Sequence, residues 1–194
     1  MDIRAILFVD GENLVFRFQE GIKAGRVPAD GIVHEQDCFV WHPDITKVSV
    51  FGLFRVCYYT SVVGDDKRIE EVKQKLSRIT FRAEVSLEQV ITGQVIPLVF
   101  KKLQQSNKTR IVDIHLVIDV LKYAHLNAVD LIYLISGDGD YLPLIQEVMR
   151  QGKQVYVGAL SSGLAKPLVY SCDEFFDLDK YLFKPTAPAQ PPPG

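Results

Sequence analysis

The chain has 194 residues, a formal net charge of −2 and 47% hydrophobic residues, which is typical of one globular domain. This composition excludes collagen-like, disordered and disulfide-scaffold proteins, and no apolar run reaches the roughly 18–20 residues that a membrane span needs. The mild acidity argues against a protein that coats nucleic acid through bulk positive charge, but it is compatible with a metal-filled acidic pocket.

The first half of the chain begins with a strand that ends at an aspartate. Residues 3–9 form an apolar run closed by Asp10, which is the pattern of a strand buried on both faces. The other expected elements are a helix at 12–20, an excursion or hairpin at 23–47, a strand at 51–60, an amphipathic helix with Ile69, Val72, Leu76 and Ile79 on one face, and either strands or a hairpin carrying an insertion at 80–100.

In the second half, short apolar strands alternate with helical patterns. This alternation predicts an α/β fold, a three-layer sandwich with a mainly parallel central sheet in a single domain. The expected elements are helices at 114–126, 141–151 and 161–171 and strands at 130–135 and 153–157. The domain is expected to span residues 1–183, and the proline-rich residues 184–194 are expected to form a flexible tail.

Aspartates follow two of the expected strands at the point where each strand ends. Asp10 closes the first strand, Asp138 and Asp140 follow the strand at 130–135, and Asp113 opens the helix before it. In an open α/β sheet these strand ends form the rim where ligands bind. Carboxylates that converge there repel one another unless a cation neutralises them, and carboxylate oxygens select Mg²⁺ or Mn²⁺ over zinc. Such a metal suits phosphoryl chemistry.

Each aspartate also has a structural interpretation. Asp140 and Asp113 could cap their own helices, whereas Asp138 and the Asp10-Gly11 pair are common in turns. Asp119 lies six positions after Asp113, about 120° around the helix, and could pair with the nearby Lys122. The joint arrangement of glycine-flanked aspartates at two strand ends nevertheless favours a functional site.

These residues resemble a known family. Asp10-Gly11-Glu12-Asn13 is similar to the D-x-x-N opening of NYN domains, which belong to the PIN-like nuclease superfamily. The stretch from Ser136 to Leu144, SGDGDYLPL, resembles the SGDGDFxPL signature of that family, with tyrosine in place of phenylalanine. Val112-Asp113-Ile114 with Asp119, and Gly152-Lys153-Gln154-Val155, match further motifs, and the LabA-like branch fits best.

The resemblance implies a ribonuclease that uses Mg²⁺ or Mn²⁺ held by Asp10, Asp113, Asp138 and Asp140 and leaves a 5′-phosphate and a 3′-hydroxyl. Asp119 would lie behind these ligands rather than among them. The expected substrate-binding residues are Asn13, Ser136, Arg110 and Lys108, where Asn13 orients Asp10 or touches substrate and either cation holds a phosphate. The expected partners are single-stranded or structured RNA and a second copy of the chain in a homodimer.

Other features of the sequence give weaker evidence of function. Lys101-Lys102 and the segment from Lys108 to Arg110 are candidates for an RNA path, although such clusters are more often solvated surface. Tyr141 could stack on a base, but packing beneath the site is the better interpretation. The spacing of His34, Cys38 and His42 would suit zinc only on a helix, so it is interpreted as chance.

Two other classes of function stay open. A nucleic-acid-binding module could keep the acidic pocket without cleaving, and a phosphatase would share its electrostatics, although Glu12 stands where a nucleophilic-aspartate phosphatase needs a second aspartate. The three widely spaced cysteines and the absence of a basic leader predict reduced thiols and a cytoplasmic location.

Overall fold

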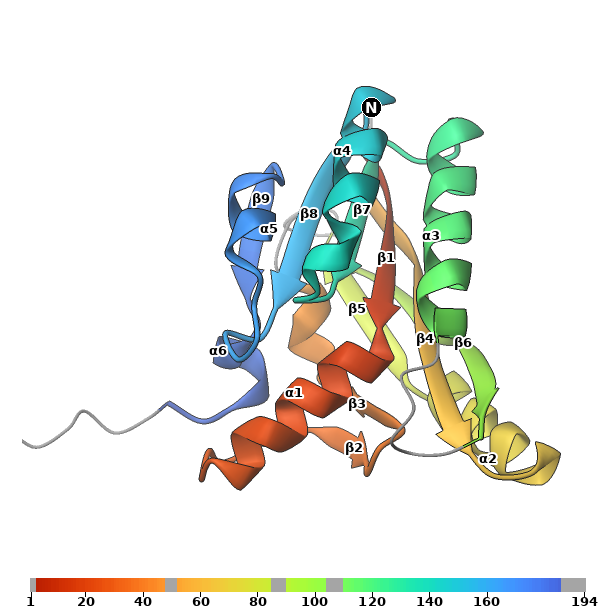
Figure 1. Ribbon diagram of the computed structural model, residues 1–194, viewed down its shortest axis with the longest axis vertical. Coiled ribbons are helices and arrows are strands. Elements are labelled where there is room, and N and C mark those ends of the chain that lie inside the picture. Colours follow the sequence, from red (N-terminus) through yellow and green to blue (C-terminus); the bar gives the residue numbers. More distant parts are fainter. Residues whose placement is uncertain (1–2, 48–51, 85–89, 104–109, 186–194) are drawn as a thin grey trace, which may run out of the picture.

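The computed structural model describes residues 3–47, 52–84, 90–103 and 110–185. Its centre is a seven-stranded sheet in the order β5-β6-β4-β1-β7-β8-β9, in which β5 runs antiparallel to β6 and the other neighbours are parallel (Figure 1). The strands are β1 (Arg4–Asp10), β4 (Gly52–Val63), β5 (Thr80–Glu84), β6 (Val90–Lys102), β7 (Leu131–Ile135), β8 (Gln154–Ala159) and β9 (Glu174–Asp177). The predicted α/β fold with a mainly parallel sheet is therefore confirmed.

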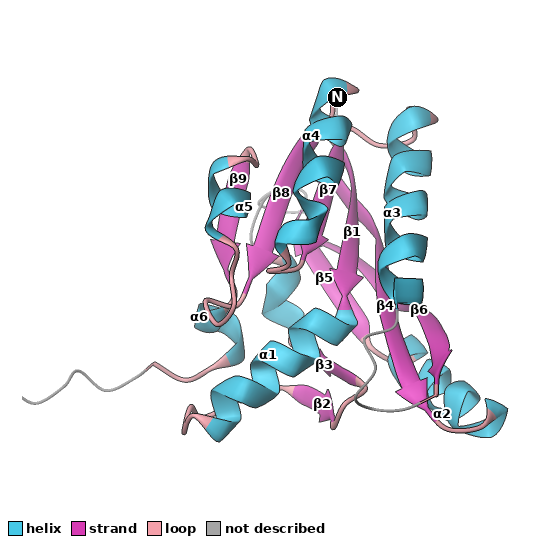
Figure 2. Ribbon diagram, in the orientation of Figure 1, coloured by secondary structure: helices cyan, strands magenta, loops and turns pink. Residues whose placement is uncertain are grey.

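Helices cover both faces of this sheet, which gives three layers (Figure 2). One face carries α1 (Gly11–Lys23), α2 (Asp66–Ser77), α6 (Asp179–Leu182) and a hairpin of β2 (Val33–Glu35) and β3 (Phe39–Trp41). The other face carries α3 (Arg110–His125), α4 (Leu142–Arg150) and α5 (Lys166–Tyr170). None of the described helices is long and apolar enough to cross a membrane.

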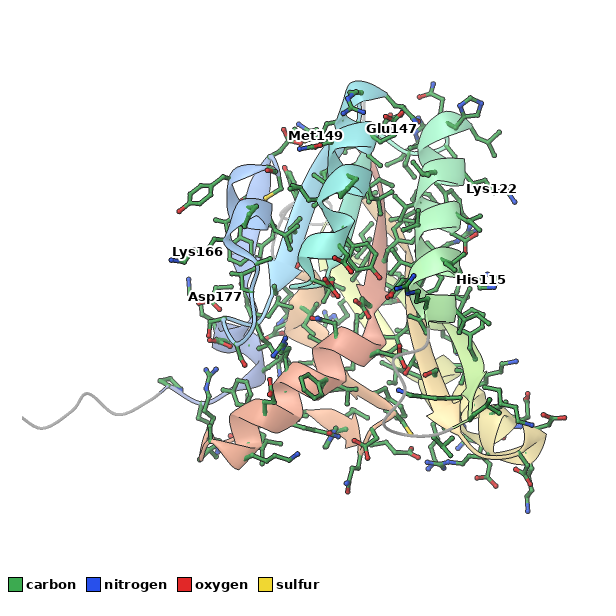
Figure 3. The ribbon with its side chains drawn as sticks, in the orientation of Figure 1. His115, Lys122, Glu147, Met149, Lys166 and Asp177 are labelled. Atoms are coloured by element: carbon green, nitrogen blue, oxygen red, sulfur yellow. The ribbon has the colours of Figure 1, made fainter. Side chains whose placement is uncertain are left out.

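The alternation of side chains along β1 explains why the sheet is covered twice. Ala5, Leu7 and Val9 belong to the core beneath α1, whereas Ile6 and Phe8 belong to the core beneath α3 and α4. The helices present matching apolar stripes, such as Leu116, Val120 and Ala124 on α3 at helical spacing. Elsewhere on α3, His115 and Lys122 are exposed to solvent (Figure 3).

The parallel strands place their carboxyl ends at one edge. β1 pairs with β4 on one side and with β7 on the other, so the loops after these strands are neighbours. Helix α1 starts directly after β1 at this edge, and a short 3-10 turn (Gly139–Tyr141) leads from the loop after β7 into α4. The expected site residues in these loops therefore lie at the rim that the parallel strands create.

Several expected elements have different bounds in the structure. The helix expected at 161–171 covers only Lys166–Tyr170, because the preceding residues turn at Gly163, whose φ of +70° is left-handed. Helix α3 begins at Arg110 rather than at residue 114. Residues 23–47 contain the β2–β3 hairpin, and residues 80–100 contain β5 and most of β6.

At the C-terminal end of the fold, the buried Phe183 ring stacks on Phe18 of α1, with centroids 5.1 Å apart. The end of the expected tail, residues 186–194, lies outside the described residues. The expected domain boundary stays a prediction.

Candidate active site

Asp10 lies buried at the carboxyl end of β1, with only 3% of its surface exposed. Its Oδ1 atom accepts a hydrogen bond of 3.1 Å from the backbone N–H of Asn13 and so caps α1. Its Oδ2 atom accepts one of 2.9 Å from the hydroxyl of Ser136, the residue that follows β7. Asp10 therefore acts as a helix cap and also joins the ends of two neighbouring strands.

The loop after β7 is held by the same two partners. The Ser136 Oγ atom accepts a 3.1 Å hydrogen bond from the backbone N–H of Asp138, and the Asn13 side-chain oxygen accepts one of 3.1 Å from the N–H of Gly137. The backbone N–H of Asp140 in turn donates to Asp138 Oδ1 over 3.0 Å. The described contacts of Asn13 and Ser136 thus position the aspartates, so these two side chains have an organising role at the rim.

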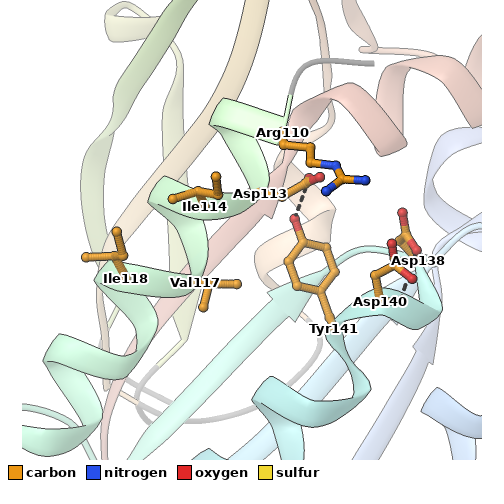
Figure 4. Close-up of a pocket in the computed structure, with 8 residues that line it drawn as sticks. All are labelled: Arg110, Asp113, Ile114, Val117, Ile118, Asp138, Asp140 and Tyr141. Atoms are coloured by element: carbon orange, nitrogen blue, oxygen red, sulfur yellow. Dashed lines mark hydrogen bonds between the residues drawn. The ribbon is translucent and has the colours of Figure 1, made fainter.

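Asp113 reaches the rim from the first turn of α3. The hydroxyl of Tyr141 donates a hydrogen bond of 3.0 Å to Asp113 Oδ1 (Figure 4). Tyr141 is only 3% exposed, and its burial together with the nearby carboxylates of Asp10 and Asp113 raises the pKa of its hydroxyl well above the ordinary value. The hydroxyl therefore stays a proton donor, and the predicted packing role of this ring agrees with its burial.

Two pockets meet at these carboxylates. The first, of about 500 Å³, has acidic residues at one end and an apolar wall from α3; its lining residues are Arg110, Asp113, Ile114, Val117, Ile118, Asp138, Asp140 and Tyr141 (Figure 4). The second, of about 360 Å³, is lined by Asp10, Glu12, Asn13, Phe16, Arg17, Lys102, Asp113 and Asp138. Asp113 and Asp138 line both pockets, so the two hollows adjoin at these two residues.

Burial changes the titration of Asp10. The pKa of this carboxyl is raised from 3.8 to about 7, chiefly by burial and to a smaller extent by the charges of Asp113 and Glu12. The hydrogen bonds from Asn13 and Ser136 act in the opposite direction. A cation beside Asp10 would restore its ionised form, because it removes the electrostatic cost of a buried negative charge.

The donor chemistry of the rim fits a hard divalent cation. Carboxylate oxygens are the ligands that Mg²⁺ and Mn²⁺ prefer, and Asp10, Asp113 and Asp138 line one pocket. Within the described ranges, however, no three His, Cys, Asp or Glu side chains form a group that could hold a metal ion. The structure therefore brings these aspartates to one rim without assembling a complete coordination shell.

Of the remaining expected site residues, one is placed away from the rim. Asp119 accepts a hydrogen bond of 2.7 Å from the hydroxyl of Tyr59 and lines a separate pocket of about 260 Å³ between the sheet and α3. Its expected place behind the metal ligands is therefore not what the described contacts show. Lys122 lines the same separate pocket. Arg110 lines the pocket that contains Asp140, whereas Lys108 lies outside the described residues.

The sequence reasoning missed the part of the site that α1 contributes through Phe16 and Arg17, although it named Lys102 as a candidate for an RNA path. Glu12, Phe16 and Arg17 line the second pocket from α1, and Lys102 reaches it from the end of β6. Glu12 accepts hydrogen bonds from the Ser61 hydroxyl and, over 3.2 Å, from Lys102 Nζ. The three- and four-residue spacing from Asn13 to the aromatic and basic residues that follow it was the signal that could have found this part of the site.

The residues spaced like zinc ligands do not share a site. The His34 ring interacts with Gln19, the His42 ring with the backbone of Asp30, and Cys38 accepts a weak hydrogen bond from an arginine. This agrees with the interpretation of their spacing as chance.

The fold and the site together define the class of protein: an α/β domain with aspartates and a capped helix at the carboxyl rim of its sheet. Residues 4–179 match the family model of the NYN domain, and the chain therefore belongs to the NYN domain family, within the PIN-like nuclease superfamily. The sequence resemblance to this family is confirmed, whereas the LabA-like branch stays a prediction.

A solved structure supports the fold. The crystal structure of a protein of unknown function from Vibrio parahaemolyticus RIMD 2210633 superimposes with a TM-score of 0.61 and 16% identity, covering 94% of this chain and 97% of the other. At this identity the likeness shows the fold alone. The comparison with curated proteins finds no match.

Proposed function

We propose that this protein is a ribonuclease that depends on Mg²⁺ or Mn²⁺ and hydrolyses phosphodiester bonds at the rim that carries Asp10, Asp113, Asp138 and Asp140. The observation that carries the proposal is the convergence of three of these residues on one pocket in a chain of the NYN family. Members of the superfamily are generally nucleases, which makes nucleic acid the expected substrate.

The four aspartates are the residues that would hold the ion. When bound, it would supply charge stabilisation at the phosphate and an activated water, and the expected products carry a 5′-phosphate and a 3′-hydroxyl. The Ser136 hydroxyl holds Asp10 through a hydrogen bond to its carboxylate, and the Tyr141 hydroxyl holds Asp113 in the same way. Arg110 lines the adjoining pocket, where its guanidinium can bind a substrate phosphate through two parallel hydrogen bonds.

The decisive experiment compares two aspartates near opposite ends of the same strand. Asp138 follows the carboxyl end of β7, whereas Asp130 precedes that strand and pairs with Arg4 on the surface. With Mn²⁺ and a labelled single-stranded RNA, we expect Asp138→Asn to lower the cleavage rate about 100-fold or more, since it removes one of the carboxylates that would hold the ion. Asp130→Asn should cleave like the wild type. Unchanged cleavage by Asp138→Asn would refute the assigned site.

The same experiment separates the other two functions. RNA that binds without turnover in both Mg²⁺ and Mn²⁺ would indicate a non-catalytic binding module, and hydrolysis confined to small phosphate esters would indicate a phosphatase. A cytoplasmic location and a homodimer remain predictions, the second testable by light scattering.

A further inference from the structure

We propose that Phe16 and Lys102 form a nucleotide subsite beside the acidic rim, in which the Phe16 ring stacks on one unpaired base and the Lys102 ammonium binds the adjacent phosphate. The inference rests on the proposed ribonuclease function and adds the residues that position the RNA strand.

Phe16 offers an exposed aromatic surface at the site. Its side chain is 53% exposed, although it lies on the same helix as the buried Leu14, Val15 and Phe18. The ring lines a pocket whose other described walls are polar or charged, so packing against apolar neighbours does not account for its position there. The guanidinium carbon of Arg17 lies 5.1 Å from the ring centroid, a cation–π contact that restrains the ring.

Lys102 supplies a positive charge in the same pocket. Its side chain is only 14% exposed, and its ammonium lies 3.2 Å from Glu12 Oε1. An ammonium has three N–H donors, so the contact to Glu12 leaves capacity for a phosphate oxygen. The neighbouring Lys101 instead contacts Asp66, 3.5 Å away, and does not line this pocket. Of the two adjacent lysines named as candidates for an RNA path, one therefore faces the site.

Each of the two pockets that share the central carboxylates has a positive side chain in its lining. Lys102 lines the pocket with Phe16, Arg110 lines the adjoining pocket, and Asp113 and Asp138 line both. A strand that crosses the aspartates can thus place one phosphate near each cation. Stacking on Phe16 requires a base outside a duplex, because bases inside a helix have both faces covered.

The test measures binding separately from cleavage. Fluorescence anisotropy with a labelled single-stranded oligoribonucleotide, in EDTA to exclude metal-dependent hydrolysis, gives the affinity of each variant. We expect Phe16→Ala to weaken binding about tenfold and Phe16→Trp to retain it, since any aromatic ring can stack on a base. Tyr170→Ala, which removes a ring that is 83% exposed on α5, is the matched control and should bind like the wild type.

Two further readouts examine the mode of binding. Trp41, the only tryptophan of the chain, is 1% exposed, so the introduced indole of Phe16→Trp reports directly on the subsite, and RNA should quench its fluorescence. Lys102→Gln should reduce the slope of log K against log salt by about 0.7, the value for one phosphate contact on a single strand, whereas Lys101→Gln should not.

The outcomes distinguish the subsite from the nuclease. Weaker binding by Phe16→Ala with no cleavage by the wild type would support the subsite and refute the nuclease. Cleavage by the wild type with unchanged affinity and KM in Phe16→Ala would overturn the subsite alone. Failure of the wild-type protein to bind the oligonucleotide, or an equal loss of duplex binding in Phe16→Ala, would also overturn it.

Discussion

The Ser136 hydroxyl donates a 2.9 Å hydrogen bond to the Asp10 carboxylate and so connects the carboxyl ends of β7 and β1. The same oxygen accepts the backbone N–H of Asp138, so one buried side chain positions two of the four candidate metal ligands. This link also lowers the pKa of Asp10, against the larger effect of burial. The balance leaves a carboxyl that titrates near neutral pH.

The first prediction concerns the stability of the metal-free protein. The pKa of Asp10 is about 7 in the folded state and near 3.8 ordinarily, so the folded state binds more protons between these values. The free energy of unfolding should therefore fall as pH rises from about 4 to 7, by at most about 1.4 kcal/mol per unit. Asp10→Asn does not titrate; its amide oxygen can accept only one of the two hydrogen bonds, so the variant should also differ from the wild type by an amount that does not depend on pH. Urea unfolding in EDTA should show that the free energy of unfolding of the variant rises relative to that of the wild type between about pH 4 and 7. The same pH dependence in both proteins would contradict the prediction.

The second prediction is that bound metal reverses this dependence of stability on pH. A cation favours the ionised carboxylate, so Mn²⁺ binding should release a proton and strengthen as pH rises through about 7. At pH 8 and a concentration one hundred times the Kd at that pH, Mn²⁺ should stabilise the wild type by about 2.7 kcal/mol. Thermal unfolding with and without Mn²⁺ measures the effect, which at the same Mn²⁺ concentration should be smaller at pH 5.5. An equal shift in Asp138→Asn would argue against binding at this rim.

Tyr141 provides a third prediction. Its hydroxyl donates to Asp113 Oδ1 over 3.0 Å, and a hydrogen bond to a charged group contributes about 1.5–3 kcal/mol. Tyr141→Phe should therefore raise the Mn²⁺ concentration needed for half-maximal cleavage about tenfold or more while the ring still fills its place in the core. Tyr133→Phe is the control, because the buried Tyr133 hydroxyl has no hydrogen-bond partner in the part of the chain that the structure describes. An equal effect of both variants would indicate a general packing change.

A fourth prediction tests the position of Asp119. Because this residue bonds to Tyr59 and lines a different pocket from the other aspartates, Asp119→Asn should leave the cleavage rate and Mn²⁺ dependence unchanged. The cost should appear in stability, as a loss of about 1 kcal/mol in the free energy of unfolding. If the variant lost activity as strongly as Asp138→Asn, the role expected from the sequence would be correct after all.

Local patterns in the sequence predict the part of the site that each strand carries. The apolar run before Asp10 and the glycine-flanked Asp138 both mark strand ends, and parallel pairing brings such ends together. Asp119 shows the limit of this reasoning: its motif places it on the correct helix, but the partner that it contacts comes from β4, sixty residues earlier in the chain. The contribution of Lys102 likewise depends on the parallel pairing of β6 with β4, which a pattern within one segment does not encode.

The final prediction concerns the glycines beside the aspartates, which look alike in sequence but not in space. A Cβ atom on Gly11 would lie 2.2 Å from Tyr58 Cε1 and 2.6 Å from the backbone oxygen of Tyr59, so the start of α1 packs against β4 too closely for alanine. A Cβ atom on Gly137 would meet its nearest neighbour at 3.5 Å, an ordinary van der Waals contact. Gly11→Ala should therefore lower the free energy of unfolding by about 1–3 kcal/mol or more, whereas Gly137→Ala should be nearly neutral. Urea unfolding of the two variants measures the difference. Similar stabilities would show that β4 can shift to accommodate the methyl group at residue 11.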